Sequence, residues 1–237
     1  MNDSPKRLLI LPQDKGGIGK SFVAALLFDH LSEEGVRLKT FDVDHANSTF
    51  NRLVPEAEFI DTDVDLDKLA VLDRVVHPLS NDEADVVLVD SRAAGGDKLR
   101  HYLDEVRLPQ LQDEIGFTLV FVVIATDDKD ANSQLAELID AYGEHVDWLI
   151  VRNLRDTPHL DLYEQSKSKK RLAELGAVEI DMPPLAEVTR NALQKANLTV
   201  GRGRSADALH LLDRSRCVRY HERMAEQFAK ARELLGT

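Results

Sequence analysis

The residues of this chain that are best suited to chemistry lie together near its start, in the segment Asp14-Lys15-Gly16-Gly17-Ile18-Gly19-Lys20-Ser21. Glycine allows the unusual dihedral angles and close approach that bring backbone N–H groups within reach of phosphate oxygens. A helix starting here would add the positive end of its dipole. In such a loop Lys20 reaches the β- and γ-phosphates and the Ser21 hydroxyl coordinates Mg²⁺. The nucleotide-binding residues predicted on this basis are Gly16, Gly17, Ile18, Gly19, Lys20, Ser21 and Phe22.

One position departs from the general phosphate-loop pattern, which has glycine where this chain has Asp14. A carboxylate beside a polyphosphate is unfavourable unless its side chain turns away, because like charges repel. The competing interpretation is a glycine-rich turn that caps a helix, with Lys20 and Ser21 present by coincidence. The order of apolar strand, loop, Gly-Lys-Ser and helix favours the phosphate loop.

Such a loop needs a strand before it and a helix after it, and the chain repeats both patterns. Short β-rich apolar runs alternate with amphipathic stretches, which is typical of a parallel sheet with crossover helices. Several runs are continuously apolar, as expected when helices cover both faces of the sheet. The predicted strands are Arg7–Leu11, Arg37–Asp42, Asp85–Asp90, Thr118–Ala125, Trp148–Arg152 and Val178–Asp181. The predicted helices are Lys20–Glu34, Asp67–His77, Asp97–Val106, Asp130–Tyr142, Leu162–Leu175, Leu185–Ala196 and a long C-terminal stretch from Ser205.

These elements predict an α/β fold, namely a doubly wound, mostly parallel sheet with helices on both faces. In such folds the ligand lies at the carboxyl ends of the strands. A length of 237 residues suits one large domain with a continuous core. We therefore expect a single domain over residues 1–237, with a helical C-terminal segment at about 205–235.

Composition narrows the class of protein further. The net charge of −12 argues against a surface built mainly for nucleic acid, although the residues after Gly201 are basic on balance. The longest apolar stretch, Phe117–Ala125, is far shorter than the ~20 residues of a membrane span. The single cysteine, Cys217, excludes an intrachain disulfide. We expect a cytoplasmic protein that does not enter the membrane.

Acidic residues follow two other predicted strands. Phe41-Asp42-Val43-Asp44 ends the second strand, and Val86-Val87-Leu88-Val89-Asp90 ends the third. These acids are candidate functional residues because of the family resemblance given below. The alternative is that the acids cap the turns that follow the strands.

The extra lysine of Lys15-Gly16-Gly17-Ile18-Gly19-Lys20-Ser21 resembles the deviant Walker A motif of the ParA/MinD family of P-loop ATPases. The similarity continues at Asp42-Val43-Asp44-His45, where the family carries Asp-x-Asp-Pro and this chain has His45 instead of proline. The strand ending at Asp90 resembles a Walker B strand. Two further segments are most similar to the plasmid conjugal-transfer (TraL-like) and partition branch of this family. They are Asn47-Ser48-Thr49-Phe50 and Asp90-Ser91-Arg92-Ala93-Ala94.

This resemblance implies roles for individual residues. Lys15 would cross a dimer interface to the partner's nucleotide and supply positive charge there, as an arginine finger does elsewhere. Asp44 would position or activate the attacking water, and Asp42 and Asp90 would hold Mg²⁺ through waters. The implied catalytic residues are thus Lys15, Lys20 and Asp44, and the implied metal site is Ser21, Asp42 and Asp90.

The choice of base depends on Asn153, which ends a predicted strand where ParA-like proteins place an asparagine on the adenine. Its amide can both donate to and accept from a base edge. The family packs a loop against the base where this chain has Pro183. Asn153-Leu154-Arg155-Asp156 also has the Asn-x-x-Asp spacing used to grip guanine, but Leu154 replaces the usual lysine, which favours ATP. A turn-forming asparagine and a bare strand-to-helix turn are the alternatives.

Two basic clusters are candidate contacts for DNA phosphates, without readout of sequence. A solvated helix face balanced by glutamates explains each cluster equally well. Apolar residues at helical spacing near the end could bind lipid, but the glutamates among them favour packing on the sheet. The clusters are Lys167, Lys169, Lys170 and Arg171, and Arg214, Arg216, Arg219 and Arg223; the apolar residues are Tyr220, Met224, Phe228, Ala231 and Leu235.

The resemblance implies a Mg²⁺-dependent ATPase that forms a homodimer around ATP and separates after slow hydrolysis. It implies a use in plasmid partition, maintenance or conjugal transfer, with an activating partner protein and non-specific DNA. One alternative is a nucleotide-dependent scaffold with negligible turnover, supported by the Asp14 and His45 departures. Another is a metabolic ATP-dependent enzyme of the same fold group, which Lys15 disfavours.

Overall fold

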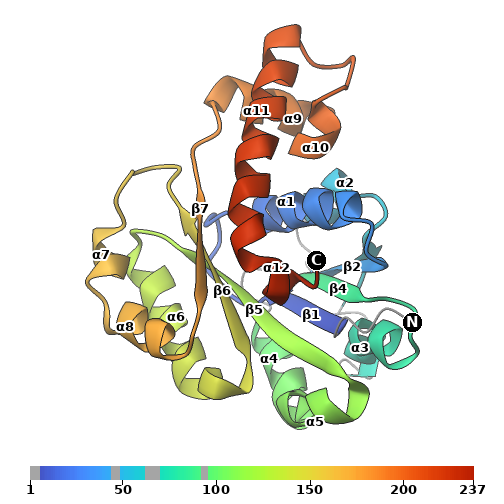
Figure 1. The fold of residues 1–237 in the computed structure, drawn as a ribbon, viewed down its shortest axis with the longest axis vertical. Helices are drawn as coiled ribbons and strands as arrows, with labels where there is room; N and C mark the ends of the chain where they lie inside the picture. The colour runs from blue at the N-terminus through green and yellow to red at the C-terminus, as the bar shows by residue number, and fades with distance from the viewer. Residues whose placement is uncertain (1–5, 44–48, 62–69, 92–95) are drawn as a thin grey trace.

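The computed structural model describes residues 6–43, 49–61, 70–91 and 96–237. They form a parallel seven-stranded sheet in the order β3-β2-β4-β1-β5-β6-β7 (Figure 1). The predicted fold class and the six predicted strands are confirmed, each strand to within one residue at either end. The strands are β1 (Lys6–Leu11), β2 (Leu38–Val43), β3 (Glu58–Phe59), β4 (Val86–Ser91), β5 (Phe117–Ala125), β6 (Asp147–Asn153) and β7 (Val178–Met182).

Helices cover both faces of the sheet and create two apolar cores. One core lies under α1, α2 and α9–α12, and the other lies under α3–α8. The upper part of α11, with α9 and α10, projects beyond the strands in Figure 1. The helices are α1 (Lys20–Glu33), α2 (Thr49–Leu53), α3 (Asp73–Ser80), α4 (Gly96–Glu105), α5 (Leu108–Ile115), α6 (Lys129–Tyr142), α7 (Asp161–Glu164), α8 (Lys167–Glu174), α9 (Glu187–Ala196), α10 (Val200–Gly203), α11 (Leu211–Phe228) and α12 (Arg232–Leu235).

Several helices differ from the sequence prediction. The helix expected over Leu162–Leu175 is two helices, because the Ser166 hydroxyl accepts the Lys169 N–H and caps α8. The helix expected over Asp67–His77 is a 3₁₀ turn at Ala70–Leu72 followed by α3, and residues 67–69 lie outside the described residues. The C-terminal helix begins at Leu211 instead of Ser205. The sequence prediction omitted α2, α5, α10 and β3.

The centre of the sheet explains where a ligand can lie. β1 pairs with β4 on one side and with β5 on the other. The connection after β1 leads to β2 on the β4 side, whereas the connection after the neighbouring β5 leads to β6 on the opposite side. The carboxyl end of such a strand is a topological switch point, where adjacent connections diverge and leave a crevice. The loop after β1, residues 12–19, occupies this position.

The C-terminal helices pack on the sheet, as the sequence analysis favoured. The apolar residues Tyr220, Met224, Phe228, Ala231 and Leu235 are all buried. The Tyr220 hydroxyl donates to the Pro183 carbonyl over 2.9 Å, which links α11 to the loop after β7. In the described part of the chain, no helix has the length and apolar character needed to cross a membrane.

A buried carboxylate joins α1 to α10. Asp29 accepts the Thr199 hydroxyl and the Gly201 N–H, each over 2.6 Å. Burial raises the pKa of Asp29 to about 6, and the two hydrogen bonds act in the opposite direction. A Cβ atom at Gly201 would lie only 2.5 Å from the Asp29 carboxyl carbon, so glycine is needed for this close approach.

Asp29→Ala should lower the free energy of unfolding by about 2–4 kcal/mol, because it leaves the Thr199 hydroxyl and the Gly201 N–H without their acceptor. Urea denaturation at pH 7 measures the change. Glu34→Ala, an exposed acid just beyond α1, is the matched control and should stay within about 0.5 kcal/mol of the parent. Equal effects of the two substitutions would contradict the role given to Asp29.

Candidate functional site

The loop after β1 has a backbone that requires glycine at two positions. Gly17 and Gly19 adopt φ angles of 78° and 103°. Gly19 precedes the first residue of α1, and a Cβ atom there would lie 3.2 Å from the Asn153 amide nitrogen. This conformation turns the chain directly into the N-terminus of α1, where unpaired N–H groups and the helix dipole favour an anion.

Gln13 links the start of this loop to the neighbouring strand β5 by two hydrogen bonds. Its amide donates to the Ile124 carbonyl over 3.0 Å and accepts the Ile124 N–H over 2.6 Å, so the side chain continues the β1–β5 pairing. Gln13 is buried, and both bonds are therefore shielded from water. The sequence does not point to this residue, because nothing in a lone glutamine signals a partner more than a hundred residues away.

Asp14 turns away from the loop, as the phosphate-loop interpretation requires. Its carboxylate forms a 2.7 Å salt bridge with Arg100 of α4, and Arg100 also donates to the Pro12 carbonyl over 3.3 Å. Both side chains of the pair are largely buried. The departure from glycine at this position is thus compensated by a cation from α4, a partner that sequence reasoning did not identify.

The two lysines of the loop have different surroundings. The Lys15 ammonium contacts Asp130 at 2.7 Å and Asp128 at 3.5 Å, and the Lys15 N–H donates to Gln134. The hydrogen bond with Asp130 raises the pKa of Lys15. Lys20 is buried, and its ammonium donates to the Lys15 carbonyl over 2.8 Å. Lys15 is therefore held by the start of α6, beside the loop.

The acids predicted on β2 and β4 lie side by side. The strand register places Asp90 opposite both Leu11 and Asp42, and both aspartates are buried. The Asp42 carboxylate accepts the N–H of Asn51 over 2.8 Å, which fixes the start of α2. The Ser91 hydroxyl donates to the Leu11 carbonyl. Asp44, predicted as a catalytic residue, and His45 lie outside the described residues.

The residues predicted for Mg²⁺ offer a suitable donor set. Asp42 and Asp90 supply carboxylate oxygens at the edge of the sheet where α1 begins, and Ser21 supplies a hydroxyl there. Mg²⁺ prefers oxygen ligands and keeps several waters, so one or two carboxylates suffice. Among the described residues, no cluster of three or more His, Cys, Asp or Glu side chains could enclose a metal. The residues therefore fit a hydrated Mg²⁺ ion better than a metal caged by protein.

Asn153, predicted as a contact for the base, hydrogen-bonds to the phosphate loop, a contact that was not predicted. Its amide donates to the Ile18 carbonyl over 2.9 Å and accepts the Arg155 N–H over 3.0 Å. One amide N–H and one oxygen lone pair remain for a base. Asp156, the acid of the Asn-x-x-Asp spacing, forms a 2.6 Å salt bridge with its neighbour Arg155. Pro183 is buried and accepts the Tyr220 hydroxyl.

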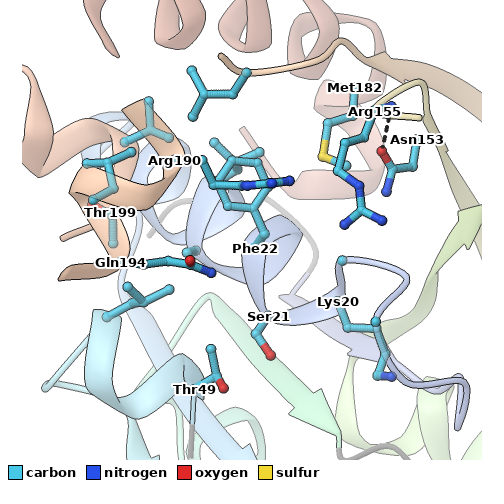
Figure 2. Close-up of a pocket in the computed structure, with 18 of the residues that line it drawn as sticks. Lys20, Ser21, Phe22, Thr49, Asn153, Arg155, Met182, Arg190, Gln194 and Thr199 are labelled. Carbon is cyan, nitrogen blue, oxygen red and sulfur yellow. Dashed lines mark hydrogen bonds between the residues drawn. The ribbon is translucent and has the colours of Figure 1, made fainter. Parts of the chain in front are cut away.

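These elements enclose a cavity of about 890 Å³ (Figure 2). Gly16, Gly17, Gly19, Lys20, Ser21, Phe22, Asn153 and Pro183, all predicted as nucleotide-binding residues, line it. Figure 2 shows Lys20 and Ser21 beside the loop and Asn153, Arg155 and Met182 along one wall. The structure thus brings most of the predicted site into one cavity. Four other predicted residues, Lys15, Ile18, Asp42 and Asp90, are not among the residues that line it.

The basic clusters are only partly available to a ligand. Lys169 is bonded to Glu179, and Arg171 to Glu174 and Glu144. Arg214 and Arg216 form salt bridges with Asp207 and Asp213. The exposed cations Lys167, Lys170, Arg219 and Arg223 remain candidates for contact with DNA.

Known proteins resemble this chain in sequence and in structure. TraL of Escherichia coli is 30% identical over 147 residues, which make up 58% of this chain and 60% of TraL. MobD of Acidithiobacillus ferrooxidans is 24% identical over 197 residues, covering 82% of this chain and 85% of MobD. No family model matches the sequence.

Solved structures agree in fold over nearly the whole chain. MinD, a cell division protein of Aquifex aeolicus, has a TM-score of 0.50 and 13% identity, covering 93% of this chain and 97% of MinD. A chain of the MinC:MinD complex from the same organism reaches a TM-score of 0.52 at 12% identity, covering 93% of this chain and 96% of that chain. This chain has the MinD fold.

The MinD fold confirms the resemblance predicted from the phosphate loop and its extra lysine, and TraL and MobD support the plasmid-transfer branch. At this identity, the likeness to MinD establishes architecture, while the roles of single residues depend on the geometry of this chain. Because the TraL alignment spans only 60% of that protein, what TraL does as a whole enters only as a proposal.

Arg100→Ala should destabilise the protein by about 1–3 kcal/mol, because it leaves the largely buried Asp14 carboxylate without its cation. Asp14→Gly restores the general phosphate-loop residue and should cost less. The double variant Asp14→Gly/Arg100→Ala should recover at least about 1 kcal/mol relative to the sum of the single changes. Urea denaturation of all four proteins measures this coupling, and additive effects would contradict it.

Proposed function

We propose that this protein is a Mg²⁺-dependent ATPase that dimerises around ATP, hydrolyses it slowly and acts in plasmid partition, maintenance or conjugal transfer. The observation that carries the proposal is the phosphate loop at the β1 switch point, with Lys15 and Lys20 on it and Asp42 and Asp90 beside it. The MinD fold and the likeness to TraL and MobD support the same conclusion.

In this proposal each part of the site has a task that follows from its position. Backbone N–H groups of residues 16–21 bind the phosphates at the start of α1, and Lys20 exchanges the Lys15 carbonyl for a phosphate oxygen. Ser21, Asp42 and Asp90 hold Mg²⁺, which when bound offsets the charge of the β- and γ-phosphates. Asp44 orients the attacking water. Lys15 reaches the nucleotide of the partner subunit.

Adenine is the proposed base. Asn153 keeps one donor and one acceptor for a base edge, and Pro183 lies at the same wall. A guanine site would use the second acid of the Asn-x-x-Asp spacing, but Asp156 is bonded to Arg155. This arrangement supports ATP over GTP.

One of the two observations that favoured the scaffold alternative, the presence of Asp14, no longer favours it. That alternative was based on Asp14, whose charge could oppose phosphate binding, and on His45. The Asp14 carboxylate faces Arg100 instead of the loop, so its presence does not argue against nucleotide binding. Non-specific DNA contact through the exposed Lys167, Lys170, Arg219 and Arg223, and an activating partner protein, belong to the proposal as well.

The Asp44→Ala variant should be dimeric with Mg²⁺ and ATP and monomeric with ADP, because blocked hydrolysis traps the ATP state. Light scattering measures the molar mass in each state. Lys15→Ala in the same background should bind ATP but stay monomeric, since it lacks the charge that crosses the interface. A protein that binds ATP and is monomeric in every state would refute the dimerisation claim.

Replacing both acids that hold Lys15, with Asp128→Asn and Asp130→Asn, should raise the dimer fraction at sub-saturating ATP. In the structure the ammonium contacts both carboxylates, and it must leave them to reach a partner's nucleotide. Asp127→Asn, next to them in the chain, is the control for a general change in charge. Titration of ATP against molar mass measures the effect, and an unchanged midpoint would show that these contacts do not restrain Lys15.

A further inference from the structure

The cavity continues well beyond the phosphate loop. Its volume of about 890 Å³ lies at the upper end of the range of ligand pockets, roughly 300–1,000 Å³. Figure 2 shows Thr49, Gln194 and Thr199 on the opposite side of Phe22 from Asn153, Arg155 and Met182. We call this second half the outer cleft, and it is lined by Arg52 and Leu53 of α2, Arg190 and Gln194 of α9, and Leu198 and Thr199.

The outer cleft combines apolar walls with positive charge. The partly exposed Leu53 of α2 and Leu198, which lies between α9 and α10, supply apolar surface, and the buried Leu193 and Val200 lie behind them. Arg52 supplies a cation to the outer cleft, and Arg190, which Figure 2 shows over Phe22 at the boundary with the other half, supplies a second, although the whole chain carries a net charge of −12.

Acidic groups in the described lining are confined to the other half of the cavity. There the lining acid is Asp156, which is already bonded to Arg155 and whose pKa is lowered mainly by that bond and to a lesser extent by Arg190. The outer cleft is thus locally positive within an acidic protein, and this charge favours an acidic ligand.

Contacts behind the cleft hold its walls in place. Arg202 of α10 donates to the Leu53 carbonyl over 3.0 Å and forms a salt bridge with Glu56, so α10 is tied to the end of α2. Thr199 and Gly201 are tied to Asp29 of α1. A cleft whose walls are already fixed loses little conformational entropy when a ligand enters.

A nucleotide bound as proposed above leaves the outer cleft open. Its phosphates lie on residues 16–21 and its base lies toward Asn153, on the other side of Phe22. A second phosphate ligand would need converging N–H groups, and the Gly201 N–H at the start of α10 is already used by Asp29. Leucine-lined walls with arginines between them instead suit a peptide with apolar and acidic side chains.

We propose that the outer cleft binds an acidic, partly apolar peptide segment of a partner protein, next to the nucleotide. This inference rests on the proposed function, because it gives the activating partner a place and a chemistry. A partner held here would contact α2, which directly follows the region that contains Asp44. Occupancy of the cleft would therefore bear on the nucleotide site through α2.

The test uses the full chain with saturating ATPγS and a short fluorescein-labelled peptide of Glu and Leu at helical spacing. Fluorescence anisotropy should show binding at least about tenfold tighter than for the matched Lys and Leu peptide. The double variant Arg52→Glu/Arg190→Glu should weaken binding of the acidic peptide by at least about tenfold. The matched control is Lys39→Glu/Lys230→Glu, which makes the same charge change at two exposed cations outside the cavity lining and should bind the peptide as the parent does.

Other outcomes would overturn the inference. Equal binding of the acidic and basic peptides would refute the proposed preference for acidic side chains. Unchanged binding of the acidic peptide to the Arg52→Glu/Arg190→Glu variant would refute it as well. Displacement of the peptide by ATPγS would assign the outer cleft to the nucleotide. Peptide binding that is weak in the ATPγS-bound parent but strong in Lys15→Ala, which should bind ATPγS as a monomer, would assign it to a second copy of this chain.

A fluorescent ATP analogue separates this inference from the proposed function. If the parent protein does not bind the analogue, the proposed function fails. If it binds the analogue but not the acidic peptide, only the inference about the cleft fails. Thermal unfolding of each variant, followed by circular dichroism, confirms that a loss of binding does not come from a loss of folding.

Discussion

Backbone N–H groups converge on a phosphate only if the loop that carries them keeps its shape before the ligand arrives. In this protein three contacts fix that loop: Gln13 pairs with β5, Asp14 with α4, and the Ile18 carbonyl with Asn153 of β6. Each contact uses a different neighbour, so the loop is anchored at its start and at its end. Preorganisation of this kind reduces the entropy lost on binding. The rest of the site depends on it, because Lys15, Lys20 and Ser21 are placed by the same backbone.

The parallel sheet supplies the two carboxylates that lie beside the phosphate loop. Register between β2, β4 and β1 places Asp42 and Asp90 in one row at the carboxyl edge, beside the end of β1. Burying two carboxylates there is costly unless a cation or hydrogen-bond donors are nearby. Asp42 accepts the Asn51 N–H, and the start of α1 adds a positive dipole. Carboxylate oxygens beside a phosphate loop are the kind of ligand that a Mg²⁺-nucleotide site uses.

The sequence predicted those parts of the structure that depend on local pattern. Continuous apolar runs such as Phe117–Ala125 predicted the buried strands, and the glycines and lysines predicted the phosphate loop. The bonds from Gln13 to Ile124 and from Asp14 to Arg100 join residues far apart in the chain, and no local pattern encodes them. The acidic run at Asp128 and Asp130 was a missed signal, since it follows β5 at the edge where Lys15 lies.

The surroundings of Lys15 show how such a site can be balanced between two states. Its ammonium lies between two carboxylates of its own chain, but the ion pairs are open to water and therefore weak. A polyphosphate carries more charge and, at an interface closed around it, attracts the lysine in a less polar medium. The acids of α6 thus stabilise the lysine in the single chain without preventing its release. If Lys15 reaches a partner's nucleotide as proposed, small changes at α6 or at the loop would shift the balance between the two arrangements.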